Sequence, residues 1–377
     1  MGLLDIFSDV KRQPAECLIE VDGESIDDLY PSLVEVEVES NRSDWTVATL
    51  IFESRRMEDG TWIIQDDERI AAWKPIKIEA AFGEETEEVM RGYIKEVRAE
   101  YPADKGGAKV TVTCQDHSIL LDRLQREERW GADAPTTDGV IATTIAQRNG
   151  LVVADSLGEG QTVEDLLQNS TDVHFLKDRA DASGYEIIFR QGEMHFGERQ
   201  LTAAPQSTIK VYAGQDTNCI SFSVREDGHQ PDSVSYQIAP EQGVEATSVE
   251  VQPNLPLLGN TPANSSNSGL ENFTWRLRKE GLSDDVQAEA AAQRAANDAA
   301  MKIKAEGELD GSLYGHVLRT GEPVGVDGVG EKNNGTYYVD SVTHRFDVDG
   351  YKAMFQLSRN AYGDNLPEED SPLAGIL

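Results

Sequence analysis

Carboxylates are the side chains of this chain most able to do chemistry, and several lie next to one another. Glycosidases use two carboxyl groups at a defined separation, one as the acid and the other as the base or nucleophile. Candidate pairs occur in Asp66-Asp67-Glu68, in Glu84-Glu85 and in Glu87-Glu88. Because the chain has 68 Asp and Glu residues, such pairs arise by chance. We therefore interpret them as solvated faces rather than as an acid and its base.

Nucleophiles and metal ligands are equally dispersed. The six histidines are scattered, and none belongs to a set of Cys and His residues with the ligand spacings of a zinc site. They are His117, His174, His195, His229, His316 and His344. No GxSxG, HExxH, P-loop or kinase signature occurs. We therefore expect no catalytic residue, no metal site and no cofactor, and we interpret the histidines as surface or partly buried structural residues.

A glycine-rich segment, residues 325–330, is superficially similar to a phosphate-binding loop. Such a loop leads into a helix, whose N-terminus receives the phosphate. Here the segment is followed by Glu331-Lys332-Asn333-Asn334-Gly335 and then by a strand pattern. We interpret it as a β-turn region.

The charge balance excludes several kinds of partner. The formal net charge is −34, which repels DNA, RNA and anionic membrane surfaces. No apolar run of about 18 to 20 residues could span a bilayer. The three cysteines, Cys17, Cys114 and Cys219, are too few and too far apart for a disulfide framework. The chain is therefore expected to be soluble and to be made in a reducing cytoplasm.

The elements that must position these residues begin with strands. In residues 33–39 the valines alternate with Glu35, Glu37 and Glu39, which indicates a half-buried antiparallel strand. Related patterns occur in residues 46–52, 76–82, 89–101 and 109–114. The segment 89–101 is long enough to bend or to bulge near Gly92. After an extension of residues 1–16, residues 17–129 are predicted to form an all-β domain whose solvent faces carry much of the acid.

The pattern changes to a helical period within residues 130–204. Asp138 is predicted to cap a helix that stops at Gly150, and a short helical turn is expected from Thr162 through Leu167. A further helix is predicted from Asp172 to the cap signal Gly184. Strands on either side of Gln191-Gly192 form a predicted hairpin. This region is predicted to be a small α+β insert.

Strand patterns return in residues 205–362, which are predicted to form a second β domain. They occur at residues 209–212, 222–224, 234–238, 273–278, 337–346 and 351–357. Residues 253–269 have the composition of a loop. An Ala-rich helix is predicted over residues 284–305, and its stripe of small side chains is expected to pack on the sheet of its own domain. Residues 363–377 form an acidic tail with an apolar end that is either frayed or a docking peptide.

Four segments, taken in this order, point to a known family. They are Met90-Arg91-Gly92-Tyr93-Ile94 with Val97; residues 110–116 with Leu120 and Leu121; residues 170–180 with Gly184-Tyr185; and residues 335–339 with His344, Gly350-Tyr351 and residues 355–359. Over about residues 17–362 the chain resembles the late control protein D family, the baseplate hub proteins of contractile phage tails and related contractile injection systems.

The resemblance implies a mainly β (α+β) fold, with two tail-tube-like antiparallel β-barrel domains, the small α+β insert, and the Ala-rich helix within the second barrel. Three copies would form a pseudo-sixfold ring that adapts the hexameric tail tube to the trimeric central spike. Surrounding baseplate proteins are further implied partners, and the tape-measure protein is another candidate. The protein would be structural, made in the bacterial cytoplasm, and located in a virion tail baseplate or an extracellular contractile particle.

Other functions stay open at this point. One is a tail-associated peptidoglycan hydrolase, and another is a carbohydrate-binding β protein that uses Trp45, Trp62, Trp73 or Trp130. Within the leading hypothesis, the spike is expected to be a separate polypeptide, and the channel for DNA or payload is expected to have an acidic wall that repels a passing polyanion. The sequence assigns no interface residue.

Overall fold

The structure is a computed structural model that describes residues 15–103, 107–238, 247–264, 269–277 and 285–366. Most of the predicted N-terminal extension and of the acidic tail lies outside the described residues. The same holds for residues 265–268 of the predicted loop and for residue 284, where the Ala-rich helix is predicted to start.

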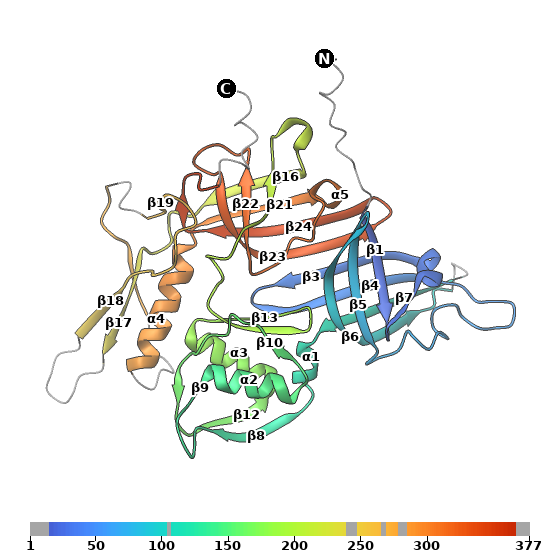
Figure 1. Ribbon diagram of the computed structural model, residues 1–377, viewed down its shortest axis with the longest axis horizontal. Helices are drawn as coiled ribbons and strands as arrows, with labels where there is room; N and C mark the ends of the chain where they lie inside the picture. The colour runs from blue at the N-terminus through green and yellow to red at the C-terminus, as the bar shows by residue number, and fades with distance from the viewer. Residues whose placement is uncertain (1–14, 104–106, 239–246, 265–268, 278–284, 367–377) are drawn as a thin grey trace.

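One large sheet dominates the molecule (Figure 1). The strands from the first third of the chain are β1 (Ala15–Val21), β2 (Glu24–Ser25), β3 (Leu33–Asn41), β4 (Asp44–Ser54), β5 (Pro75–Phe82), β6 (Glu85–Glu100) and β7 (Ala108–Asp116). The strands from the second half are β15 (Gln206–Lys210), β16 (Cys219–Glu226), β21 (Ile303–Asp310), β22 (Pro323–Asp327), β23 (Gly335–Asp347) and β24 (Gly350–Arg359). The short 3-10 helices η1 (Asp27–Ser32) and η2 (Gly214–Asp216) precede β3 and β16. The predicted mainly β fold is confirmed.

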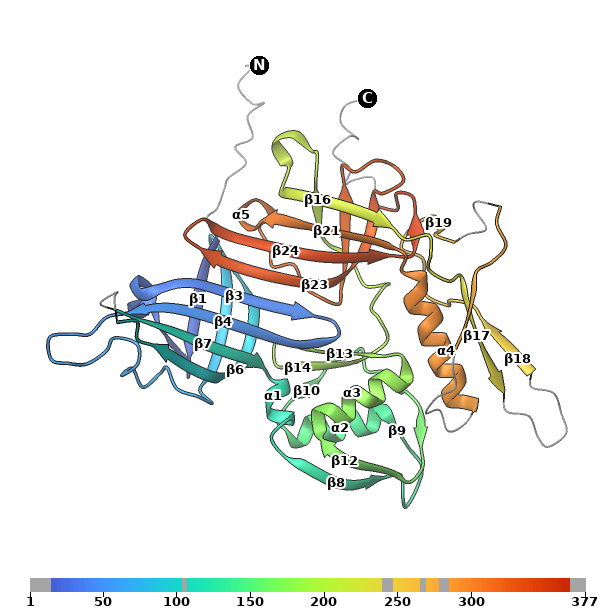
Figure 2. The ribbon, with the colours of Figure 1, turned by 180° about the vertical axis from the view of Figure 1, so that it is seen from behind.

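The two sets of strands form one continuous sheet. In the described part of the chain its order is β16-β21-β24-β23-β3-β4-β7-β6-β5-β1-β2, with β22 beside β23 and β15 beside β22. Figure 2 shows this row running from β16 through β3 to β6. The sets meet where β3 pairs antiparallel with β23, so that Val38 lies opposite His344. The sequence patterns did not predict this pairing.

The order of strands repeats within the sheet. The run β3-β4-β7-β6 has the same connectivity and direction as the run β16-β21-β24-β23. A bulge places Val34 as an extra residue in β3, and Ile220 is the extra residue at the same point of β16. Lys95 in β6 and Asp340 in β23 are a second matching pair of bulges. Each half of the sheet therefore contains one copy of a four-stranded unit.

The first bulge corrects the prediction for residues 33–39. Val36 and Val38 are fully buried, as expected from the alternation. Val34 is instead 40% exposed, because the bulge reverses its direction relative to the strand. The glutamate face is only partly solvated, since the Glu35 carboxylate binds the Arg345 guanidinium at 2.7 Å across the β3–β23 junction.

The region between the two sets of strands contains helices and short strands. They are α1 (Ser118–Leu121), β8 (Gln125–Trp130), β9 (Thr136–Thr137), α2 (Asp138–Arg148), β10 (Val152–Val153), β11 (Thr162–Val163), β12 (Leu166–Thr171), α3 (Asp172–Ser183), β13 (Glu186–Arg190) and β14 (Glu193–Gly197). The helix ending at Gly184 and the β13–β14 hairpin around Gln191-Gly192 are confirmed. Gly184 has φ 69°, the left-handed conformation that favours glycine after a helix.

Two predictions in this region are wrong. Thr137, not Asp138, caps α2, because the Thr137 hydroxyl accepts a hydrogen bond from the Val140 N–H. Asp138 is instead buried and binds Arg179 at 2.7 Å. The expected helical turn after Thr162 is a pair of strands, because Leu166–Thr171 pairs with Gln125–Trp130 and takes its conformation from that partner.

The Ala-rich helix belongs to a smaller layer at one end of the molecule (Figure 1). Helix α4 (Asp285–Ala300) covers a sheet of β17 (Ser233–Ile238), β18 (Thr247–Val251) and β20 (Thr274–Arg276). Ala288, Ala292 and Ala296 are buried against Val234 and Tyr236, so the expected packing on a nearby sheet is confirmed. The remaining elements are β19 (Thr261–Pro262), α5 (Gly311–Tyr314) and β25 (Ala361–Tyr362).

The end of the Ala-rich helix and the glycine-rich segment were both predicted incorrectly. The helix stops at Ala300, and the next residues form β21, whose Ile303 and Ala305 lie in the core between β16 and β24. Pro323–Asp327 is the buried strand β22 rather than a turn. The turn begins only after it, where Gly328 and Gly330 have φ of 88° and 89°.

Candidate functional site

The residues considered for chemistry do not converge in the structure. Among the described residues, no group of three or more His, Cys, Asp or Glu side chains could hold a metal ion. His344 is buried and shares a hydrogen bond of 2.8 Å with the Tyr351 hydroxyl. Burial lowers the pKa of His344 to about 4, so this imidazole is neutral at pH 7. All three cysteines are unpaired thiols.

Three carboxylates from the acidic pairs make structural contacts. The Glu87 carboxylate accepts a hydrogen bond from the Val317 N–H at 3.0 Å and lies 2.7 Å from His316, so it connects β6 to the second half of the chain. Its neighbour Glu88 binds Arg91 at 2.7 Å. Asp67 binds Arg69 at 2.7 Å. Each of these carboxylates is thus occupied by a partner in the fold.

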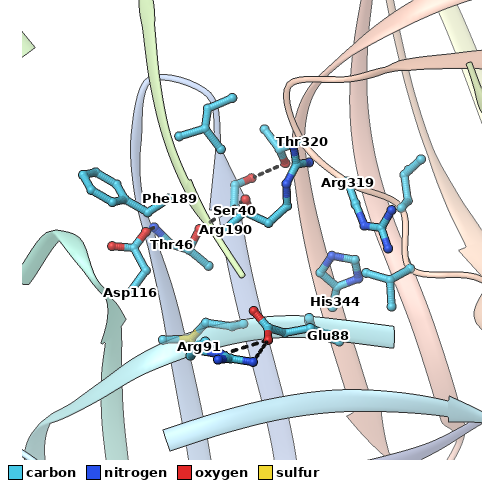
Figure 3. A pocket seen from close by; sticks show the side chains of 15 residues that line it. Ser40, Thr46, Glu88, Arg91, Asp116, Phe189, Arg190, Arg319, Thr320 and His344 are labelled. Atoms are coloured by element: carbon cyan, nitrogen blue, oxygen red, sulfur yellow. Dashed lines mark hydrogen bonds and ion pairs between the residues drawn. The ribbon is translucent and has the colours of Figure 1, made fainter. Parts of the chain in front are cut away.

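The structure does bring together three of the segments that carried the family resemblance. Met90, Arg91, Asp116 and His344 line a cavity of about 40 Å³, and Figure 3 shows Asp116 and Arg91 on one side of it and His344 on another. Residues of the β13 strand and residues 317–320 complete the wall. The cavity therefore lies where the two halves of the sheet and the inserted region meet.

Gly92 allows the strands at this cavity to approach closely. A Cβ atom on Gly92 would lie 2.0 Å from the Gln115 carbonyl oxygen and 2.7 Å from the Asp116 Cα atom. Any larger residue would force β6 away from β7 at the point where Gly92 lies opposite Asp116. The glycine in the first segment and the aspartate in the second are thus parts of one contact.

Asp116 ties three elements together. Its carboxylate accepts hydrogen bonds from the Thr46 N–H at 2.7 Å and from the Ser118 N–H at 2.9 Å, on β4 and α1. Burial raises the pKa of Asp116 to about 6 despite these hydrogen bonds. The cavity beside it has room for a few water molecules but not for a substrate, so we interpret it as a structural junction.

A series of alternating positive and negative side chains crosses the region where the two halves of the sheet and the inserted region meet. Asp340 on β23 lies 3.3 Å from Lys304 and 2.8 Å from Arg42. Arg42, on the turn between β3 and β4, also lies 2.8 Å from Glu186 on β13. Glu186 in turn binds Arg199 at 3.2 Å.

The series of charged side chains is buried and hydrogen-bonded at its centre, around Glu186. The Glu186 side chain is 5% exposed and accepts a further hydrogen bond of 2.6 Å from the Tyr338 hydroxyl. Burial acts to lower the pKa of Arg42, but the charges of Glu186 and Asp340 outweigh burial and raise it. The last member, Arg199, binds Asp298 on α4. The series of ion pairs therefore joins the sheet, the inserted region and the Ala-rich helix.

Sheet edges are further surfaces through which a β protein can bind a partner. The edge of β15 is covered, because the Asn218 side chain accepts from the Lys210 N–H at 2.8 Å and donates to the Thr208 carbonyl at 3.1 Å. The edge of β1 is covered in part by the Tyr30 hydroxyl, which accepts from the Ile19 N–H at 2.8 Å. Within the described residues, β16 pairs only with β21, and the second half of β6 pairs only with β7. These two edges are open.

Three of the four candidate tryptophans pack against other aromatic rings. Trp45, Trp62 and Trp130 are half-buried and pack against Phe189, Tyr101 and Phe175. Trp73 is 46% exposed, with the Arg123 guanidinium 4.4 Å from its ring centroid. An open stacking platform for a sugar is not formed by these four side chains.

The sequence patterns predicted strands and helices but not the contacts that form the junction. The β3–β23 pairing joins residues about 300 positions apart, and the Glu35–Arg345 contact spans 310. No local pattern encodes such a distance. The one signal that could have suggested the junction is the family resemblance itself, because its segments supply Gly92, Asp116 and His344.

Comparison with known proteins gives this fold a context. A family model described as the Alg8 N-terminal domain matches residues 11–347. No curated protein matches the chain. Among the described residues, none of the helices is both long enough and apolar enough to cross a membrane.

Solved structures with a similar fold are tail and secretion proteins. The 43 kDa tail protein of prophage MuSo2 from Shewanella oneidensis matches 92% of this chain and 98% of its own, with 14% identity and a TM-score of 0.67. A tail protein from Neisseria meningitidis matches 92% and 97%, with 13% identity and a TM-score of 0.63.

A third similar structure comes from a secretion machine. It is a component of the E. coli type VI secretion system, described as structurally similar to the T4 tail proteins gp27 and gp5. It matches 93% of this chain and 79% of its own, with 12% identity and a TM-score of 0.57. The fold is therefore one found in phage tails and in a related secretion system.

Proposed function

We propose that this chain, which belongs to the family of the Alg8 N-terminal domain, is the structural baseplate hub of a contractile tail or injection particle. The observation that carries the proposal is the repeated four-stranded unit, because three copies of a chain with two such units present six similar units around a ring. Such a ring adapts a hexameric tail tube on one side to a trimeric central spike on the other. The likeness to tail and type VI secretion proteins supports this assignment.

For the domains we keep the boundaries expected from the sequence: residues 17–129 and 205–362 as the two tube-like domains, and residues 130–204 as the insert. Strand β8, at the end of the first segment, pairs with β12 of the insert. The resemblance to the late control protein D family supplies the expected partners: tail tube, spike and surrounding baseplate proteins, with the tape-measure protein as a further candidate. The protein acts without turnover, binds no nucleic acid specifically and does not insert into a membrane. It is made in the cytoplasm and resides in the virion tail or the extracellular particle.

The acidic wall of the channel is part of the proposal. Glu37 and Glu39 lie on the same face of β3, the strand that pairs with β23. Burial, together with the charges of Glu39 and Glu35, raises the pKa of Glu37. Like charges are therefore crowded on this face of the sheet. A polyanion passing such a wall is repelled rather than bound.

The oligomeric state tests the proposed function. Native mass spectrometry and sedimentation of the full chain, alone and with the spike protein, should show a trimer. A protein that stays monomeric in both conditions contradicts the hub assignment. A peptidoglycan zymogram on the same preparation should be blank, and a cleared band would favour the hydrolase alternative. An electron-microscopy map of the ring with a neutral or basic channel wall would contradict the acidic channel.

A further inference from the structure

The internal repeat matches residue by residue, and this defines which positions are equivalent. Val36 and Val38 of β3 lie opposite Leu50 and Ala48 of β4. Phe222 and Val224 of β16 lie opposite Gly307 and Ala305 of β21 in the same arrangement. The equivalences follow the strand registers and the two shared bulges. Val36 corresponds to Phe222, Val38 to Val224, Glu37 to Ser223 and Glu39 to Arg225.

The same comparison relates β6 to β23. Val97 lies opposite Val112 in β7, and Val342 lies opposite Phe355 in β24. Counting from the shared bulge, Ala99 corresponds to His344, Glu100 to Arg345 and Tyr101 to Phe346. Both sides of the β3–β23 junction therefore occur a second time in the chain. The β3 side is repeated by β16, and the β23 side is repeated by the end of β6; we call these two edges the second version of the junction.

In the second version both sides are unpaired. Within the described residues, the outer edge of β16 and the outer edge of residues 95–100 have no strand beside them. In the strand order, β21, β24, β23, β3, β4 and β7 separate the two edges within one chain (Figure 2). Open edges expose backbone N–H and C=O groups that pair readily with another strand.

The burial of equivalent residues supports an interface at these edges. At the β3–β23 junction, Val36 and Val38 are fully buried, and Val342, His344 and Phe346 are 1%, 3% and 8% exposed. Their counterparts Phe222, Val224, Val97 and Ala99 are all only half-buried, and Tyr101 is 58% exposed. The second version therefore retains apolar surface at the positions where the first version has buried it against a neighbouring strand.

We propose that β16 of one copy pairs antiparallel with residues 96–101 of the next copy, in the register of the β3–β23 junction. In that register Val224 lies opposite Ala99, Ser223 opposite Glu100 and Phe222 opposite Tyr101. The inference rests on the proposed trimer and names the surface that forms it. The contact joins unlike surfaces, so it propagates from copy to copy and closes into a ring when the rotation per copy completes a circle.

The charges on the outer face are mixed in this pairing. Arg225 is exposed and binds no carboxylate within the described part of the chain, whereas its neighbour strand in the proposed pair carries Glu96 and Glu100. Both glutamates are diagonal to Arg225 on the same face, within reach of a long side chain. Arg98 lies directly opposite Arg225, and this like-charge contact disfavours the pairing. Arg98 already binds Glu100 of its own strand at 2.8 Å, and Glu96 and Glu100 together reduce the repulsion between the two arginines.

Disulfide trapping tests the register. Ser223→Cys and Glu100→Cys are combined in one chain, and the protein is oxidised with copper phenanthroline at the highest concentration it tolerates. We expect covalent dimers and closed trimers on a non-reducing gel. Glu37→Cys with Arg345→Cys is the matched control, because this pair occupies the equivalent positions of the internal junction and should cross-link within one chain. The pair Glu100→Cys with Ser248→Cys, whose second residue is exposed on β18, should give no ladder.

The outcomes separate this inference from the proposed function. A preparation that is trimeric by mass but forms no Ser223–Glu100 cross-link overturns the strand pairing and leaves the trimeric hub intact. A preparation that stays monomeric overturns both. As an independent measurement, Ala99→Lys places a charge at the half-buried edge and should weaken trimer formation at least about tenfold, while its circular dichroism stays that of the parent. Ser248→Lys should leave association unchanged, and an Ala99→Lys variant that associates normally contradicts the pairing.

Discussion

Replacing Glu186 by Gln should loosen the junction more than any single change on the outer surface. Gln has almost the shape of Glu, so the change removes a charge without creating a cavity. The Glu186 carboxylate is 5% exposed and faces Arg42 at 2.8 Å, Arg199 at 3.2 Å and the Tyr338 hydroxyl at 2.6 Å. After the change, two arginines face a neutral amide at the centre of the charge chain.

The magnitude follows from what each arginine keeps. Removing one partner of a buried ion pair typically costs about 3 to 5 kcal/mol, because a charge is left uncompensated. Here Arg42 keeps Asp340 at 2.8 Å, and Arg199 keeps Asp298. We therefore expect a loss of about 3 kcal/mol in the free energy of unfolding, at the lower end of that range.

Urea unfolding at pH 7 and amide hydrogen exchange measure the effect. The exchange experiment should show lost protection in the β13–β14 hairpin and in the β3–β4 turn, while the centre of the large sheet stays protected. Arg129→Gln is the matched control, because the Arg129–Asp165 pair is about 60% exposed on both sides and should contribute little to stability. Equal stability of Glu186→Gln and the parent, or protection lost evenly over the chain, would refute the reasoning.

Three further changes address other contacts. The Asp116 carboxyl has a pKa of about 6 when folded against 3.8 for a free Asp, so the folded state binds its proton more tightly and stability should fall as pH rises from about 4 to 6. Between about pH 4 and 6, the free energy of unfolding of the parent should fall on the order of 3 kcal/mol more than that of Asp116→Asn, as measured by urea titrations. Stability curves for the two proteins that run parallel with pH would show that Asp116 is not the group responsible. Gly92→Ala should cost roughly 3 kcal/mol by forcing β6 from β7, whereas Gly228→Ala, which meets no atom within 4 Å, should be near neutral in the same titration. Ala292→Leu should overpack α4 against Val234 and lower the free energy of unfolding by about 1 to 3 kcal/mol. Amide hydrogen exchange in α4 should become faster, and unchanged exchange would show that the helix can move aside.

Local patterns in the sequence predicted most strands of the large sheet. The alternation of apolar and polar residues in β5, β7 and β24 is a property of a few neighbouring residues, and it survives folding because one face of each strand is buried. The same holds for α3 and its glycine cap. These elements are set by their own residues.

The elements that were predicted incorrectly take their conformation from distant partners. Residues 303–305, predicted as the end of the Ala-rich helix, instead begin β21, which lies between β16 and β24 and pairs with both. Leu166–Thr171 is extended because it pairs with β8. The Val34 side chain is exposed because of a bulge, and the bulge arises only from the pairing of β3 with β4. Contacts between strands, not propensity, decide these three cases.

The junction could be predicted only in part. The family resemblance singled out Gly92, Asp116 and His344 as members of separate segments, and the structure places their segments around one cavity. The charge chain through Arg42 and Glu186 carries no sequence signature, because each member is an ordinary charged residue whose partner lies elsewhere in the chain. The expectations about the extreme ends of the chain fall outside the described residues.

The pairing of β3 with β23 also constrains how the protein is made. Ribosomes add roughly 5 to 20 residues per second, so the nascent chain that contains β3 waits about 15 to 60 s for β23 to be translated. During that interval the first four-stranded unit can fold, but the edge of β3 has no partner from its own chain. Bound chaperones, or neighbouring nascent chains on the same messenger, meet this edge before the native strand does. Synthesis rate and chaperone supply should therefore govern the yield of correctly closed sheets.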